Sequence, residues 1–371
     1  MPTTLDKLIA SSAARLGKNV DRHRATPAIS LAQHVRWMRQ VRAARVTGKR
    51  IVYLDTNAWK CLADFEQQKP KLTSAMQDFA LATRAALLRG DTVFPIGLAT
   101  FFELDSMTSE DTHNALVTLV DDLSKGYCVA PFPECIGMEL DQLRAGDFNL
   151  QEDRSSYLRS PVELLGIPAA SFAPEMAALI DENTFNKAFF DTISELPFSL
   201  QLQVARSAPG PKWSNSRSTA ELNTGKQLHQ DEVPNLNTGI LLELKGCIEA
   251  WCIGEQTSLD PKQVLQLAAA AMYHWHQVPR TKALPTMRIL SSLYGLMRFD
   301  PQRRYQDGDP SDFTVAAAAL PVADALLTDR RLAILLSDPR IALNQFLDCT
   351  VVSGFEGMAE YISRPHTPSD A

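Results

Sequence analysis

The sequence predicts an α/β fold, with a parallel β-sheet between helices and a mainly helical region inserted into the chain. The apolar run Ile51–Leu54 has no polar alternation, which is typical of a strand buried on both faces. This run and a second one at 92–97 each lead directly into a helical segment. The alternation of strands and helices then stops near residue 133 and returns after residue 300. These three observations favour one sheet built from two separated parts of the chain.

Residues 1–50 are expected to form a basic helical arm. They contain eleven Lys and Arg against two Asp, a net charge of +9, whereas the whole chain carries −6. The other 321 residues therefore carry −15 (−6 minus +9). A helix is predicted over 31–45, with arginines recurring every three residues. This helix could meet a phosphate backbone, or it could be a solvated face that is salt-bridged to the acidic body; both interpretations stay open.

The bulk composition indicates a soluble globular protein. At 371 residues and 45% apolar content, the chain is long enough for two domains or one enlarged domain. No apolar run approaches the roughly 18 residues of a membrane span, and the N-terminus lacks the apolar centre of a secretion signal. The six cysteines are scattered without a CxxC pair, so we expect them to be reduced, in a cytoplasmic protein.

The segment Asp55-Thr56-Asn57 marks the first junction between a strand and a helix. Asp55 is expected at the carboxyl end of a central strand, where open α/β sheets place their ligands. Asp is also a common helix N-cap, so Asp55 alone does not establish a site.

A second junction follows the predicted strand 92–97, where the helical stretch 98–107 carries Glu103 and Asp105. Two residues that are two apart cannot share a helix face, so only one of them can point at Asp55. Glu103 is chosen because Phe101 and Leu104 define the buried stripe beside it. A helix over 109–125 and a third strand over 127–132 complete this part of the chain.

Residues 133–300 are expected to be a mainly helical insertion that shapes access to a site or binds a partner. Helices are predicted over 239–255, 261–277 and 285–299, each with an apolar face. His274 and His276 are two apart on such a helix and point away from each other, so we do not expect them to be metal ligands. No recognisable catalytic motif occurs in this region.

The alternation of helix and strand returns over 308–331. Pro310 and Ser311 begin a helix with Asp312 in its first turn, and a strand over 325–327 leads to Asp329. The helix rises about 13 Å and the return to Asp329 climbs at most about 20 Å, which brings Asp312 and Asp329 to the same end of the sheet. Asp324, about 16 Å from Asp329 along that strand, is assigned a capping or surface role.

Four carboxylates are thus expected at one edge of the sheet: Asp55, Glu103, Asp312 and Asp329. Negative charges so close together raise one another's pKa values unless a cation is present. Hard oxygen ligands select Mg²⁺ or Mn²⁺, and no histidine or cysteine accompanies the motifs to suggest zinc. A pair of metals held by carboxylates is a common means of hydrolysing a phosphodiester.

The motifs VYLDTNAW, ATFFEL and SDFTVAAAALPVADALLTDRRL resemble the PIN domain, a fold of metal-dependent nucleases. The family's four acids fall on Asp55, Glu103, Asp312 and Asp329. The resemblance implies a PIN-like parallel sheet flanked by helices, with residues 51–132 and 301–371 as its two parts. It also implies an endoribonuclease that uses Mg²⁺ or Mn²⁺. The basic arm and the long helical insertion depart from the compact family pattern and leave the substrate open.

Several polar residues beside the motifs are candidate substrate contacts. A basic pair and an aromatic side chain near the metals could grip phosphate and stack a base, although the arginines could equally neutralise nearby acids. The candidates are Asn57, Arg303, Arg304, Arg330 and Arg331. RNA is favoured over DNA by the resemblance alone, and an inhibitory protein partner or self-association also remains open.

Two other functions compete with the nuclease. One is a catalytically silent PIN-like module that binds RNA or a protein partner, although such a scaffold has no need to gather four acids. The other is a phosphatase or small-molecule hydrolase of the doubly wound class. That class requires a second Asp two residues after its nucleophile, and Asn57 occupies this position.

Overall fold

The computed structural model describes residues 4–148, 154–164, 179–200, 202, 215–345 and 347–366. Within these ranges the chain is an α/β protein built on a four-stranded parallel sheet with the order β2-β1-β5-β6. Its strands are β1 (Arg50–Leu54), β2 (Thr92–Val93), β5 (Ala325–Thr328) and β6 (Thr350–Ser353). The central strands β1 and β5 are paired although some 270 residues separate them in the chain. The sheet therefore joins the two parts that sequence patterns predicted.

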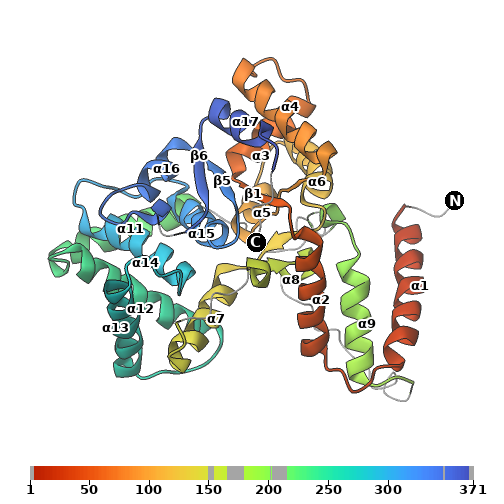
Figure 1. Ribbon diagram of the computed structural model, residues 1–371, viewed down its shortest axis with the longest axis horizontal. Helices are drawn as coiled ribbons and strands as arrows, with labels where there is room; N and C mark the ends of the chain where they lie inside the picture. The colour runs from red at the N-terminus through yellow and green to blue at the C-terminus, as the bar shows by residue number, and fades with distance from the viewer. Residues whose placement is uncertain are drawn as a thin grey trace.

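Two apolar cores lie on the two faces of the sheet. Ile51 and Tyr53 point into one core and Val52 and Leu54 into the other, as successive residues of a strand must. The first core contains side chains of α7 (Phe132–Ala145), α12 (Leu236–Gly254), α13 (Pro261–Gln277), α14 (Pro285–Phe299), α15 (Asp309–Ala319) and α16 (Arg330–Leu336). The second contains side chains of α3 (Thr56–Glu66), α4 (Ser74–Arg89), α5 (Leu98–Asp105), α6 (Glu110–Ser124) and α17 (Phe355–Ser363). This arrangement of helices on both faces, visible in Figure 1, explains why residues 51–54 of β1 and 325–327 of β5 are apolar.

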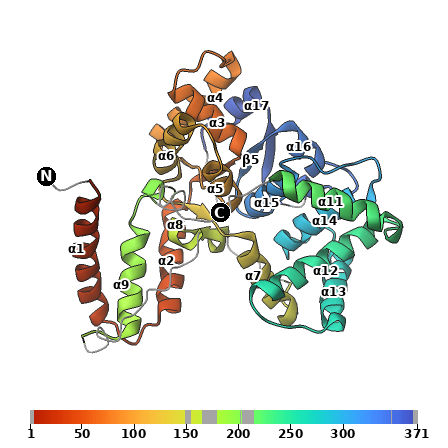
Figure 2. The same ribbon diagram turned by 180° about the vertical axis from the view of Figure 1, so that it is seen from behind.

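The N-terminal arm contains two helices, α1 (Thr4–Arg24) and α2 (Leu31–Val46). Both pack against α9 (Glu182–Ser194), which belongs to the helical insertion. The three helices lie side by side at the edge of the molecule in both views (Figures 1 and 2). The arm is thus attached to the insertion as well as to β1, which follows it directly.

The remaining elements are short or peripheral. A two-stranded antiparallel sheet pairs β3 (Cys128–Val129) with β4 (Leu158–Arg159). The helices α8 (Pro161–Leu164) and α11 (Asn215–His229) belong to the insertion. Short 3-10 turns lie at 154–157, 230–232 and 343–345. All six cysteines are free, and no helix in the described ranges combines the length and apolar character needed to cross a membrane.

Several predicted boundaries were correct and others were wrong. The helices expected over 261–277 and 285–299 have those bounds, and the helix expected over 31–45 extends by one residue. The expected strand 92–97 is regular only at Thr92–Val93, because Phe94–Gly97 leaves the ladder apart from one bridge at Ile96. The expected strand 127–132 shrinks to two residues, because Pro131 ends it and α7 begins at Phe132. Strand β6 was not predicted.

Candidate functional site

Asp55 lies at the carboxyl end of β1 and caps α3. Its Oδ1 accepts a hydrogen bond of 2.9 Å from the backbone N–H of Ala58, and its own N–H donates to the carbonyl of Leu327 on β5. The helix cap therefore fixes the side chain of Asp55, and the neighbouring strand fixes its backbone. Asp55 is buried, with 5% of its surface exposed. Asp55 is therefore a helix cap and also lies at the carboxyl end of a central strand, two roles that the sequence left as alternatives.

Asp329 occupies the equivalent position after β5. Its Oδ1 accepts a hydrogen bond of 2.8 Å from Leu332 and so caps α16. From β1 the chain continues to β2 on one side, and from β5 it continues to β6 on the other. The carboxyl ends of β1 and β5 therefore form a topological switch point, the place where open α/β sheets bind ligands. Asp55 and Asp329 lie at this crevice.

Glu103 approaches the same edge from α5. The hydroxyl of Thr56, the residue next to Asp55, donates a hydrogen bond to its carboxylate. Phe101 and Leu104 are both buried in the second core, as the choice of Glu103 over Asp105 assumed. The buried side of α5 thus fixes the rotation of the helix, and Thr56 connects Glu103 to the first junction.

Asp312 lies in the first turn of α15. The helix begins at Asp309, one residue earlier than predicted, after Gly308 with a φ of +100°. This backbone conformation suits glycine, and a Cβ at Gly308 would lie 4.0 Å from Oδ2 of Asp312. The backbone N–H of Asp312 bonds to the carbonyl of Gly308 at 2.9 Å. The sharp turn therefore orients the first turn of α15.

The four carboxylates are close enough to affect one another's ionisation. The pKa of Asp312 is raised to about 8 by burial and by the negative charges of Asp329, Glu103 and Asp55, with a further contribution from Asp309. The pKa of Asp55 is raised to about 6, mainly by burial and also by the charge of Asp329, while the cap bond from Ala58 acts in the opposite direction. Two acids at this edge are thus unfavourable as bare anions near neutral pH.

The acids form an open rather than a closed cluster. Among the residues that the structure describes, no three of the four carboxylates bring oxygen atoms within 4.8 Å of one another. Mg²⁺ retains several water ligands, so carboxylates can hold it partly through water at such separations. The geometry fits a hydrated cation better than a cage made entirely of protein ligands.

Asp309 is a fifth acid beside this site, and sequence reasoning gave it no role. It is 1% exposed and forms a two-pronged ion pair with Arg331, whose Nε and a terminal nitrogen each lie 2.8 Å from a carboxylate oxygen. Arg331 is therefore committed to Asp309.

Of the other candidate substrate contacts, one arginine is already paired within the protein and three side chains are exposed. Arg303 pairs with Asp300 and Asp338, so its guanidinium is also engaged within the protein. Arg304, Arg330 and Asn57 are exposed, and no ion pair of Arg304 or Arg330 occurs in the part of the chain that the structure describes. These three side chains remain available to a ligand.

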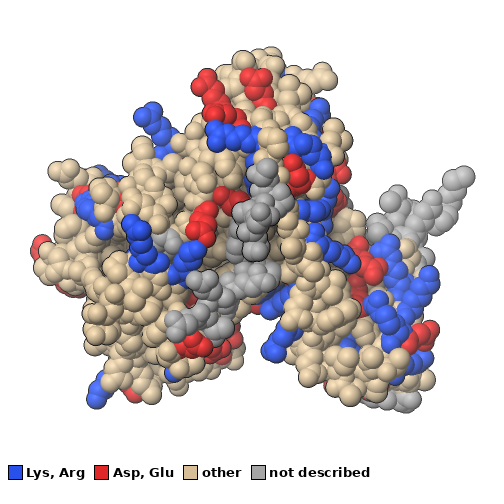
Figure 3. Space-filling model, in the orientation of Figure 1, with Lys and Arg blue, Asp and Glu red and all other residues tan. Residues whose placement is uncertain are grey.

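Some arginines of the basic arm form salt bridges within the protein, and others face solvent. Arg39 and Arg42 of α2 pair with the buried Glu163 at 2.7 and 3.2 Å, as the salt-bridged alternative expected. Arg36 and Arg45 are exposed, and Figure 3 shows basic side chains along the surface that α2 forms. Half of these four arginines thus attach the arm and half face solvent.

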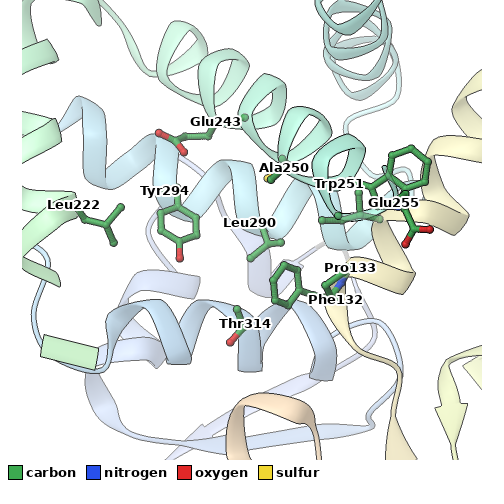
Figure 4. Close-up of a pocket in the computed structure, with 14 residues that line it drawn as sticks. Phe132, Pro133, Leu222, Glu243, Ala250, Trp251, Glu255, Leu290, Tyr294 and Thr314 are labelled. Carbon is green, nitrogen blue, oxygen red and sulfur yellow. The ribbon is translucent and has the colours of Figure 1, made fainter. Parts of the chain in front are cut away.

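An apolar cavity of about 540 Å³ lies between α7, α11, α12, α14 and α15. Phe132, Trp251 and Leu290 line it, with Glu243 at one end and Glu255 at the other (Figure 4). Thr314 is its contact with α15, two residues after Asp312 and thus on the opposite side of that helix. The cavity is separate from the four-acid site.

We compared the chain with protein-family models, with curated proteins and with solved structures, and none of the three comparisons found a match.

Proposed function

We propose that this protein is a metal-dependent endonuclease that hydrolyses phosphodiester bonds, with RNA as its substrate. The observation that supports it is the convergence of Asp55, Glu103, Asp312 and Asp329 at the switch point of a parallel sheet. A structural role alone would not require four acids in one place, since each carboxylate raises the cost of ionising the next. The resemblance of the motifs to the PIN domain supports the same activity.

The donor set suits Mg²⁺ or Mn²⁺. All four ligands would be carboxylate oxygens, which hard divalent cations prefer. The caps of α3 and α16 use only Oδ1 of Asp55 and Asp329, so each acid can offer its second oxygen without losing its cap. When bound, such a cation supplies Lewis-acid catalysis of phosphodiester hydrolysis.

The residues of the chain have distinct parts in this proposal. Asp55 and Asp329 are the rigid ligands, because each is fixed by a helix N-terminus. Glu103 is positioned by the hydroxyl of Thr56. Asp312, with a pKa near 8, binds either a proton or a cation at neutral pH. The exposed Arg304 and Arg330 are the proposed contacts to phosphates of the substrate.

A cleavage assay with matched variants tests the proposal. Labelled single- and double-stranded RNA and DNA are incubated with Mg²⁺, Mn²⁺ or EDTA. We expect metal-dependent cleavage of RNA by the wild type and a loss of at least about 100-fold in Asp55→Asn, because loss of even an outer-shell partner costs 10- to 100-fold. Two matched controls should retain activity. They are Asp324→Asn, at the far end of β5 where its carboxylate bonds to Ile51, and Asp105→Asn, on α5 beside Glu103.

The outcomes separate the alternatives. Absence of cleavage together with absence of Mn²⁺ binding by calorimetry would refute the four-acid site and favour the catalytically silent binding module. Mn²⁺ binding without cleavage would point instead to a masked site or to a substrate outside the panel. Equal losses in Asp105→Asn and Glu103→Gln would show that the wrong acid of α5 was assigned.

A further inference from the structure

The three-helix unit formed by α1, α2 and α9 has a small apolar core. This core joins the buried Val35 of α2 and Phe190 of α9 to Val162 of the neighbouring α8, and Phe185 and Ala188 of α9 are also buried. Within 11–24, the part of α1 whose side chains are described, the only buried residues are the polar Asn19 and His23. Helices normally attach through an apolar stripe, and small units without one rely on another constraint such as a disulfide or a structural metal.

Within 11–24, the buried contacts of α1 are polar. Asn19 donates to the hydroxyl of Thr192 at 3.0 Å, and Lys187 donates to the carbonyl of Thr26 in the turn after α1. At the centre lies a buried cluster of His23 from α1, His34 from α2 and Asp191 from α9. Their side chains are 6, 7 and 3% exposed. One residue from each helix therefore meets at a single point.

The geometry of this cluster is that of potential metal ligands. Nε2 of His23 lies 2.7 Å from one carboxylate oxygen of Asp191, and Nε2 of His34 lies 2.7 Å from the other. The three ligand atoms are within 4.8 Å of one another, and the imidazole rings are nearly perpendicular, at 79°. Two imidazoles and a carboxylate form a common ligand set for zinc, which takes a fourth ligand such as water.

We propose that His23, His34 and Asp191 bind a structural Zn²⁺ ion that fastens the N-terminal arm to the helical insertion. Coordination distances of about 2.0–2.2 Å require only that the side chains turn slightly toward a common centre. Arg22 pairs with the oxygen of Asp191 that His23 also contacts. Its side chain is 58% exposed, so it can turn into water when a cation binds.

The alternative is a metal-free hydrogen-bonded cluster. In that arrangement Arg22, His23 and His34 all donate to Asp191, and the carboxylate is satisfied without an ion. The zinc site and the hydrogen-bonded cluster use the same residues. They are distinguished by the metal content of the protein and by variants whose side chains can donate a hydrogen bond but do not bind zinc.

The experiment measures zinc in untagged full-length protein, purified without chelators and dialysed against buffer. We expect about one equivalent of zinc per chain by elemental mass spectrometry. His34→Gln and His23→Gln, whose amides can still donate a hydrogen bond, should retain less than about a tenth of that amount. His276→Gln, at an exposed histidine of α13, is the matched control and should retain all of it. Asp55→Asn should also retain it, which separates this site from the proposed catalytic site.

A second measurement does not depend on variants. Replacement of zinc by Co²⁺ in the wild type should give the visible absorption of a tetrahedral site, and added Zn²⁺ should abolish it. Removal of zinc should speed trypsin cleavage within 11–46 by about tenfold, because local opening becomes easier. The proposal would be overturned by wild-type protein that neither contains zinc nor binds Zn²⁺ or Co²⁺, or by zinc retained equally in His34→Gln.

Discussion

Two buried acidic sites in this molecule differ in how their charge is balanced. Asp191, in the three-helix unit, is surrounded by donors. Although burial alone would raise its pKa, hydrogen bonds from His34 and His23 hold the pKa below the ordinary value. Asp312, at the sheet edge, is surrounded by acids, and its pKa rises to about 8. The comparison shows that, without a metal, donors surround one buried acid and further acids surround the other.

The largest expected change in stability comes from removing Arg331, the positive charge that pairs with Asp309 beside the sheet edge. Arg331→Ala leaves Asp309 buried without its guanidinium, next to the other acids. Loss of one partner of a buried ion pair costs about 3–5 kcal/mol, and we expect the low end of this range, about 3 kcal/mol, because the Arg331 side chain is 37% exposed. Urea unfolding at pH 7 would measure this loss. Arg330→Ala, at the exposed neighbour, is the control and should change stability by less than about 0.5 kcal/mol. Equal stability of the two variants would show that Asp309 does not depend on Arg331.

A smaller loss of stability is expected when Asp191, the acid surrounded by donors, is replaced. In protein freed of metal with EDTA, Asp191→Ala removes the acceptor of three donors and should lower the free energy of unfolding by about 2 kcal/mol. Because the pKa of Asp191 is lowered in the folded chain, its stabilisation is present near neutral pH and is lost as pH falls through that lowered value. The difference between wild type and variant should therefore shrink in acid. A difference that is constant down to pH 2 would contradict this assignment.

In contrast, Asp312→Asn is expected to raise the free energy of unfolding. The folded-state pKa of Asp312 is raised from 3.8 to about 8, so its contribution to stability falls as pH rises between these values. Without divalent cations, the Asn variant should be more stable than wild type by about 1–2 kcal/mol at pH 8, a discounted figure because water reaches this partly exposed carboxylate. At pH 4 the two should be nearly equal. Mg²⁺ or Mn²⁺ should stabilise wild type at pH 8 and remove the difference. Thermal unfolding across this pH range measures both effects.

The smallest effects are expected from the exposed arginines. Arg304→Ala and Arg330→Ala should each weaken RNA binding about two- to fivefold and reduce its salt dependence, because each removes one phosphate contact. Fluorescence anisotropy in an Asp55→Asn background, which prevents cleavage, measures the binding. Arg280→Ala, at an exposed arginine between α13 and α14, is the control. Unchanged affinity in both test variants would place the RNA elsewhere on the surface.

Much of the sheet edge could be predicted from sequence because local patterns encode it. The apolar runs before Asp55 and Asp329 define strands, and each Asp caps the helix that follows. The convergence of these junctions then follows from the geometry of a parallel sheet. Whether the site binds a metal and cleaves RNA stays a prediction.

Contacts between distant segments could not be predicted in this way. His23, His34 and Asp191 come from three helices, and no spacing in the chain relates Asp191 to the histidines. The pair of Arg331 with Asp309 depends on how α16 packs beside α15. Strand β6 was missed because its four residues are only partly buried, and β3 is short because Pro131 interrupts it. In each case tertiary packing decides what local propensity leaves open.

The pairing of β1 with β5 has a consequence for how the protein is made in the cell. Leu54 lies opposite Leu327, so the centre of the sheet closes only when most of the chain has been translated. A nascent chain that has reached the end of the helical insertion carries Asp55 and Glu103 but lacks the other two acids. The complete set of four carboxylates first exists after residue 329 has emerged, so the proposed cleavage of RNA would begin only when synthesis of the chain is nearly finished.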